Sequence, residues 1–333
     1  MQHRITDSNN LTDAEALLAE GGKVVVQFSG PTYLQSTLRR LNELAKFYKN
    51  RVEIRFYGHY SSSFDLNTLK QVENVSNLSI DCLLNVSNFE AINELHWLDR
   101  LSIGVYNELP EDILSYPSLE NLRSLTISES KQRKLNLSHL SRFHRLHNLY
   151  LVGHTRSIET VGLLSNLNSL GLSQIGSKQG LGFLNSLEGL KKLTVILGGR
   201  ENLNEVFSQS LEELEVIRVR GVSELITGNF PRLKSLRIED QIRLTELSFG
   251  SKSRDLQSIF IGNCKELTSL KGLCKLSSLE RLRVFQTSVD FDRLVSEGLP
   301  PDLSEFAFYS RSRKMDVEIH KKLAAMGYQL SGG

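Results

Sequence analysis

The stretch LRSLTI at residues 122–127 decides the fold, because its apolar residues stand at the first, fourth and sixth places and this pattern recurs along the chain. The first residue of each copy, its anchor, is Val75, Leu98, Leu122, Leu146, Leu167, Leu190, Leu214, Leu233, Leu256, Leu279 or Leu303. Successive anchors lie 19 to 24 residues apart. A period of roughly 20 to 50 residues is typical of solenoids, so the sequence predicts stacked repeats.

The spacing within a copy predicts a short β-strand. Leu125 and Ile127 are two residues apart, so both point to one side of a strand while Ser124 and Thr126 point to the other. A lone strand cannot bury its apolar side, whereas parallel strands about 4.8 Å apart share one core. We therefore expect a parallel sheet that runs through the repeats and exposes a polar face.

The repeat resembles the leucine-rich-repeat family, whose unit reads L-x-x-L-x-L-x-x-N/C-x-L. The resemblance covers about residues 70–310 and implies an α/β solenoid, a curved right-handed superhelix with a parallel concave β-sheet. Eight residues after each anchor, where the family usually has Asn or Cys, only Cys264 fits. The buried turns must therefore find other hydrogen-bond partners. The 19-residue step to Leu233, which contains Pro231, predicts an abbreviated outer segment.

Both ends of the repeat array are expected to be capped. A β-rich run at residues 23–28, a helical pattern at 31–50 and a β-rich run at 52–57 predict a strand-helix-strand unit that covers the first open edge. Residues 315–328 predict an amphipathic helix that closes the last repeat. We expect one domain, organised as an N-terminal capping unit at 1–70, about eleven repeats at 71–310, and a C-terminal cap helix and tail at 311–333.

Composition narrows the classes of function. The 333 residues are 40% hydrophobic and 23% charged, which is typical of a soluble folded protein. Forty Lys and Arg against 38 Asp and Glu give a net charge too small to make nucleic acid or an anionic membrane the expected partner. The chain shows neither an apolar run long enough for a membrane span nor a secretory signal, and Cys82, Cys264 and Cys274 form no disulfide framework. We expect a cytoplasmic protein.

A search for catalytic or ligand-binding motifs predicts no catalytic, metal-binding or cofactor-binding residue, and we expect neither an enzyme nor a cofactor. His139, His144, His147 and His154 cluster in the sequence, but the repeat geometry sends them to different places. The glycine-rich stretches at residues 176–182 and 197–202 have neither the lysine of a phosphate loop nor its strand-to-helix context, and they predict turns.

The exposed sheet face is the informative surface, because residues two, four and six places after each anchor should line it. In the first six copies these residues are mostly small and polar, whereas the last five copies place five arginines and several aromatic rings against two glutamates. Arginine and aromatic residues are enriched at protein-binding hot spots. The predicted partner-binding residues of this concave strip are Tyr150, Arg218, Arg220, Arg237, Phe260, Arg281, Arg283, Phe285 and Tyr309.

The expected function is protein binding, since a solenoid presents a long surface rather than a pocket. The partner would carry an acidic patch and would be inhibited or sequestered, as a toxin is by its immunity protein. An adaptor or sensor that recruits a partner is the alternative. Two further interpretations of the strip stay open: its side chains only keep the sheet soluble, or its arginines bind nucleic-acid phosphates.

Overall fold

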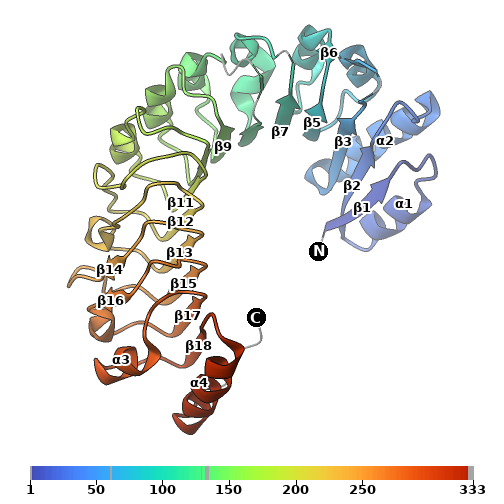
Figure 1. Ribbon diagram of the computed structural model, residues 1–333. Coiled ribbons are helices and arrows are strands. Elements are labelled where there is room, and N and C mark those ends of the chain that lie inside the picture. Colours follow the sequence, from blue (N-terminus) through green and yellow to red (C-terminus); the bar gives the residue numbers. More distant parts are fainter. Residues whose placement is uncertain (1, 61, 108, 129, 132–134, 329–333) are drawn as a thin grey trace. The chain divides into compact units, whose positions relative to one another are not determined.

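A computed structural model describes residues 2–60, 62–107, 109–128, 130–131 and 135–328. The chain forms two compact units, Met1–Leu167 and Asn168–Gly333. In both units each repeat contributes one short parallel strand, and the segments that connect the strands are mostly 3-10 helices or irregular (Figure 1). The division falls within the predicted repeat segment, and the predicted boundaries at residues 70 and 310 stay predictions.

The first unit contains seven parallel strands of the main sheet, in the order β1 (Gln2–Thr6), β2 (Lys23–Phe28), β3 (Val52–Gly58), β5 (Asn77–Leu83), β7 (Arg100–Val105), β8 (Ser124–Ile127) and β9 (Asn148–Val152). The predicted strand-helix-strand unit is present as β2, α2 (Gln35–Tyr48) and β3. The sequence-based prediction missed β1 and α1 (Thr12–Ala19), which precede that unit. The connecting segments carry η1 (Lys49–Arg51), η2 (Leu66–Gln71), η3 (Phe89–Glu94), η4 (Ile113–Ser115), η5 (Pro117–Asn121), η6 (Leu137–Arg142), η7 (Ile158–Leu163) and the paired strands β4 (Phe64–Asp65) and β6 (Val86–Ser87).

The second unit contains the other seven strands of the main sheet, in the order β10 (Ser169–Ser173), β11 (Lys192–Ile196), β12 (Glu213–Ile217), β13 (Ser235–Glu239), β15 (Ser258–Gly262), β17 (Arg281–Phe285) and β18 (Glu305–Tyr309). The predicted terminal helix is α4 (Arg313–Ala325), which packs beside β18, while the predicted tail at 329–333 lies outside the described residues. The connecting segments carry η8 (Gly182–Ser186), η9 (Thr227–Asn229), η10 (Leu273–Lys275), α3 (Phe291–Ser296) and the paired strands β14 (Glu246–Ser248) and β16 (Ser269–Lys271). Among the described residues, no helix combines the length and the apolar character needed to cross a membrane.

The apolar residues of each copy form the core, as the pattern predicts. In the sixth copy Leu190, Leu193 and Val195 are each at most 2% exposed, and Leu193 lies opposite Leu170 of the neighbouring strand. Burying one such side chain contributes about 1.5 to 3 kcal/mol, which offsets the entropy lost in ordering the chain. The opposite side of each strand is free of this constraint and can vary in chemistry.

The predicted register of the seventh copy is wrong. Leu214 pairs with Leu193, so it is the second apolar residue of its copy and the anchor is Leu211. The steps on either side of this anchor become 21 and 22 residues, and the short step disappears. The sequence allowed both registers, because Leu211, Leu214 and Val216 fit the pattern as well as Leu214, Ile217 and Val219 do. The consequence is that Val216 is buried, at 1% exposure, rather than exposed on the sheet face.

The turn after each strand gives independent evidence for this register. A left-handed backbone, with positive φ, recurs seven residues after the anchor at Cys82, Gly153, Gln174, Leu197, Arg218, Asp240, Asn263 and Gln286. Arg218 joins this series only when the anchor is Leu211. The corrected eighth position is Val219, which is 1% exposed and continues the series of buried turn residues.

Buried turns find hydrogen-bond partners other than the family's usual Asn. Gln241 is fully buried, and its Nε2 donates to the carbonyl oxygens of Glu239 at 2.7 Å and Val216 at 3.1 Å. Cys264, also fully buried, donates from Sγ to the carbonyl oxygen of Gly262 at 3.4 Å, and burial raises the pKa of its thiol to about 11. Cys264 is therefore a structural residue of the turn, at the one position that fits the family's usual Asn or Cys.

Candidate protein-binding surface

The sheet face of the second unit consists of the first, third and fifth residues of each strand. The pairing of the strands arranges these residues in three rows, which are Ser169, Lys192, Glu213, Ser235, Ser258, Arg281 and Glu305; Gly171, Thr194, Glu215, Arg237, Phe260, Arg283 and Ala307; and Ser173, Ile196, Ile217, Glu239, Gly262, Phe285 and Tyr309. The rows hold one lysine and three arginines against four glutamates. The face therefore lacks the overall excess of arginine that the sequence predicted.

Arg218 and Arg220 do not belong to the predicted strip. Both follow β12, and the register correction places Glu213, Glu215 and Ile217 on the sheet face instead. Arg218 occupies the left-handed turn and pairs with Asp240 at 2.9 Å. Both arginines are exposed, at the edge of the sheet where the strands end.

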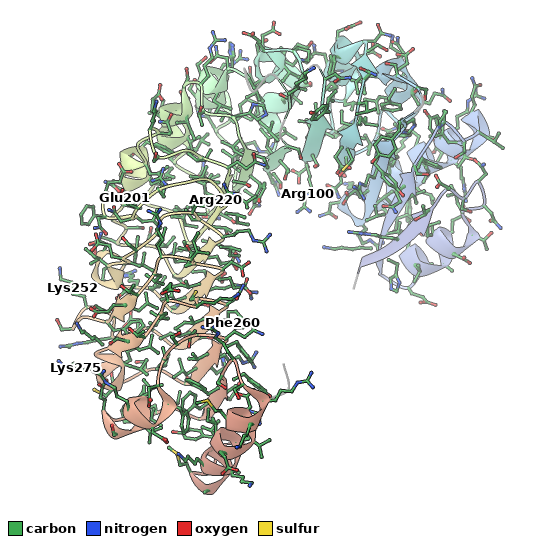
Figure 2. The ribbon with its side chains drawn as sticks, viewed as in Figure 1. Arg100, Glu201, Arg220, Lys252, Phe260 and Lys275 are labelled. Carbon is green, nitrogen blue, oxygen red and sulfur yellow. The ribbon has the colours of Figure 1, made fainter. Side chains whose placement is uncertain are left out.

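The other predicted residues of the second unit lie together on β13, β15, β17 and β18. We call the set of Arg237, Phe260, Arg281, Arg283, Phe285 and Tyr309 the aromatic–arginine cluster. Figure 2 shows Phe260 on the strand side of the unit, while Lys252 and Lys275 lie on the outer side. Tyr150 belongs to β9 of the first unit, and its predicted part in binding stays a prediction.

The aromatic rings of this cluster form a continuous row. The centroids of Phe260 and Phe285 lie 5.5 Å apart, and those of Phe285 and Tyr309 lie 5.1 Å apart with a 14° angle between the ring planes. Tyr309 in turn contacts His320 of α4 edge to face, at 4.6 Å. All three rings are half-buried, so each keeps an exposed part while its neighbours hold it in place. Such an ordered apolar row loses little conformational entropy when it binds a partner.

The arginines surround a hollow of about 240 Å³ next to the rings. Among the described residues, the ion pairs of Arg281 and Arg283 are long, at 3.7 Å to Glu280 and 3.5 Å to Glu305. The side chains of Arg281 and Arg283 are 43% and 40% exposed, so their guanidinium groups can be reached from the solvent. Arg281 and Arg283 therefore retain donors that an incoming carboxylate could use.

Two charged side chains at the border of this hollow, Arg237 and Glu215, are held in place by neighbouring residues. Arg237 lies 4.6 Å above the Phe260 ring and pairs with Glu239 at 2.9 Å. Glu215 accepts hydrogen bonds from Lys192 at 3.0 Å and Thr194 at 2.8 Å. Burial raises the pKa of Glu215, but the two hydrogen bonds outweigh it, so the pKa lies below its ordinary value. Glu215 is thus ionised and already engaged, and among the described residues the ion pairs of Arg281 and Arg283 are longer than those of Lys192 and Arg237.

The sheet face of the first unit is chemically different. Its central feature is Arg55, which donates to Asp81 at 2.7 and 2.9 Å and to Gln27 at 3.2 Å, and which lies 4.5 Å above the Tyr57 ring. Burial opposes the charge of Arg55, but Asp81 outweighs that effect and raises the pKa of the guanidinium above its ordinary value. Arg55 is therefore held by close contacts inside the molecule, whereas Arg100 on β7 of the same face is exposed.

The predicted turns and the histidine cluster fall at separate places in the fold. Gly198 has a φ of +83°, and a Cβ atom there would lie 2.4 Å from the carbonyl oxygen of Ile175, so the stretch at 197–202 is a tight turn. His154 is buried, and its Nε2 lies 3.0 Å from the carbonyl oxygen of Ser128, while the Nδ1 of His147 lies 2.6 Å from that of Arg145. Within the described ranges, no three metal-ligating side chains of His, Cys, Asp or Glu gather at one place.

Comparisons with known proteins were made by sequence and by structure. No protein-family model matches the chain, and no curated protein matches its sequence. Among solved structures, Toll in its complex with Spätzle from Drosophila is similar with a TM-score of 0.56 at 14% identity, over 96% of this chain and 48% of that one. An internalin from Listeria monocytogenes gives 0.47 at 17% identity, over 80% and 82%. A leucine-rich-repeat protein from Leptospira interrogans gives 0.42 at 17% identity, over the full length of both chains.

The fold is that of a leucine-rich-repeat solenoid, which confirms the class predicted from the repeated hexapeptide. Stacked strands with one variable, exposed face suggest a protein–protein interaction module.

Proposed function

We propose that this protein binds a partner protein through the aromatic–arginine cluster and thereby inhibits or sequesters it. The observation that carries the proposal is the row of Phe260, Phe285 and Tyr309, held half-exposed beside Arg281 and Arg283, whose ion pairs are long. Aromatic rings supply apolar surface that is removed from water when a partner binds, and guanidinium groups supply directed hydrogen bonds. Together they form the usual centre of a binding hot spot.

The cluster also defines the chemistry of the partner. The hollow beside the rings has room for one acidic side chain, which Arg281 and Arg283 would hold. An apolar side chain of the partner would cover Phe285. The partner therefore needs a single exposed acidic residue beside an apolar one, which is a narrower requirement than a broad acidic patch.

Two observations outside the cluster support the choice of a protein ligand and of a compartment. Toll shares the fold and was solved in complex with the protein Spätzle, so this architecture can present a protein-binding surface. We further propose a cytoplasmic location, which the free thiols of Cys82, Cys264 and Cys274 favour. An immunity protein that neutralises its cognate toxin is one example of the proposed pair of inhibitor and protein partner.

The test is a capture experiment with matched charge reversals. Purified wild type, Arg283→Glu and Arg100→Glu are immobilised, and proteins bound from a lysate of the source organism are quantified. Arg100 is an exposed arginine on β7 of the other unit, so its reversal makes the same change of charge on a different sheet face. We expect a stoichiometric partner on wild type and Arg100→Glu that is lost from Arg283→Glu. A partner that binds Arg283→Glu as well as wild type would contradict the proposed site.

Inhibition is tested on the captured partner itself. Its activity is measured as the protein is added, and loss of activity at a one-to-one ratio supports inhibition. If the partner keeps its full activity in the saturated complex, the protein acts as an adaptor or sensor and not as an inhibitor. The proposed binding surface would be the same in both cases.

A further inference from the structure

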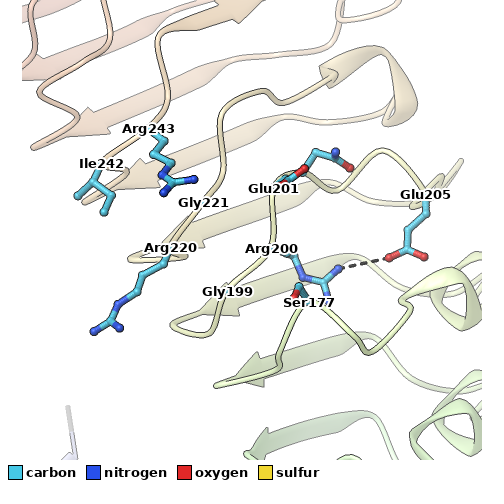
Figure 3. Close-up of a pocket in the computed structure, with 10 residues that line it drawn as sticks. Ser177, Gly199, Arg200, Glu201, Glu205, Arg220, Gly221, Ile242 and Arg243 are labelled. Carbon is cyan, nitrogen blue, oxygen red and sulfur yellow. Dashed lines mark hydrogen bonds and ion pairs between the residues drawn. The ribbon is translucent and has the colours of Figure 1, made fainter.

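A second hollow, of about 580 Å³, lies at the edge of the second unit, in the turns that follow β10, β11, β12 and β13 (Figure 3). Three arginines line it, and Glu201 and Glu205 are the acidic residues in its wall. Its volume falls within the range of about 300 to 1,000 Å³ that is typical of small-molecule sites. The hollow is separate from the sheet face, because none of its lining residues belongs to the aromatic–arginine cluster.

The first line of evidence is the buried guanidinium of Arg200, which lines this hollow and is only 5% exposed. Its Nη2 donates to the carbonyl oxygen of Gln179 at 2.9 Å, and its Nη1 lies 3.3 Å from Glu205 Oε1, a contact marked in Figure 3. Its Nε is buried and has no hydrogen-bond partner within the described part of the chain.

Desolvation makes this arrangement costly without a further anion. Burial lowers the pKa of Arg200 below its ordinary value, although Glu205 opposes the shift. Glu205 itself keeps 44% of its side chain exposed, so it compensates the buried charge incompletely. Buried charges in folded proteins are almost always fully compensated, so the incompletely compensated guanidinium of Arg200 in the wall of a hollow favours an anion there.

The second line of evidence is the position of two more arginines at the same hollow. Arg220 and Arg243 line it, both are exposed, and neither has an ion pair or a side-chain hydrogen bond among the described residues. The backbone between them turns at Gly221, where φ is +103° and a Cβ atom would lie 3.0 Å from the carbonyl oxygen of Arg200. Glycine therefore allows the close approach of the two turns that carry Arg200 and Arg220.

We propose that this edge hollow binds a small organic or inorganic polyanion, through carboxylate or phosphate oxygens that accept hydrogen bonds from Arg200, Arg220 and Arg243. Guanidinium groups pair with both kinds of oxygen in a planar, two-pronged geometry. The anion balances the buried charge of Arg200, and the two exposed arginines donate further hydrogen bonds from the rim of the hollow. The site is independent of the proposed binding of a protein partner.

The experiment uses citrate and pyrophosphate as separate probes in calorimetric titrations of the full chain at low ionic strength. Citrate tests for a carboxylate ligand and pyrophosphate for a phosphate ligand. We expect saturable one-to-one binding of at least one probe. The double variant Arg220→Glu/Arg243→Glu should weaken it by about tenfold or more, because each arginine supplies a charge-assisted hydrogen bond.

The matched control is Lys252→Glu, which reverses an exposed charge on the outer side of the same unit and should leave the affinity within about twofold. A second readout is the NMR signal of the Arg200 Nε–H group, which should shift on titration in the wild type. The proposal is overturned by the absence of saturable binding of both probes, or by equal weakening in the double variant and in Lys252→Glu. Because Phe285→Ala alters only the sheet face, it should not change the affinity for either probe.

Discussion

The sheet faces of both units are formed by parallel strands, but an ion-paired arginine on each face differs in burial and in its distance to the carboxylate. On the first unit, Arg55 and Asp81 form a close ion pair whose side chains are 22% and 17% exposed. On the second unit, Arg283 and Glu305 lie 3.5 Å apart and are 40% and 42% exposed. The difference shows that charge alone does not mark a binding surface. An arginine held by a short, half-buried ion pair supports the fold, whereas an exposed arginine with a long ion pair can bind a partner.

The largest expected change in stability tests which residues of β12 lie on the sheet face of the second unit. Val216→Asp places a carboxylate in the core and should lower the free energy of unfolding by about 4 kcal/mol. Ile217→Asp, one residue further along β12, places the same group on the half-exposed side and should cost about 1 kcal/mol. Urea unfolding monitored by circular dichroism measures both variants. The opposite order of the two losses would restore the register with Leu214 as the anchor and return Arg218 to the sheet face.

A smaller effect should separate the two ion pairs. Asp81→Ala leaves the half-buried Arg55 without its carboxylate and should destabilise the protein by about 2 kcal/mol. Glu305→Ala removes a solvent-screened partner and should cost less than about 0.5 kcal/mol. Thermal unfolding at fixed pH compares the two. Equal losses would mean that the arginines of both faces contribute equally to the fold, and the contrast between the faces would disappear.

The repeat pattern predicted the solenoid because burial acts on every copy in the same way. Each copy must bury three apolar residues. The spacing of the neighbouring copies therefore indicates which residue is the anchor when one copy is ambiguous. The seventh copy was nevertheless assigned the wrong anchor, because Leu211 and Leu214 both begin a valid pattern. Only the pairing of Leu214 with Leu193 decides between them. The left-handed turn at Arg218 could not help either, since that position usually favours Gly or Asn and here carries a charged residue.

The position of the aromatic–arginine cluster on the sheet face was predictable, because side chains alternate along a strand. The balance of charges on that face and the ion pairs of its arginines were not predictable. Sequence counting assigned five arginines to the face, whereas the structure leaves three there and adds Glu213 and Glu215. Nothing in the sequence indicates that Arg55 has a short ion pair, with Asp81, or that the ion pair of Arg281 is long. The edge hollow was also missed, since Arg200, Arg220 and Arg243 come from three separate turns and share no motif.

The most direct test of the proposed binding surface is the affinity of the captured partner for Phe285→Ala. Phe285 is the middle ring of the row, and its removal deletes contact area without changing charge. Surface plasmon resonance should show binding weakened by about tenfold relative to wild type, with the loss mostly in the dissociation rate. Tyr150→Ala, a truncation on the other unit, serves as the comparison and should have the smaller effect. An affinity of Phe285→Ala within about twofold of wild type would contradict the assignment of this face as the partner-binding surface.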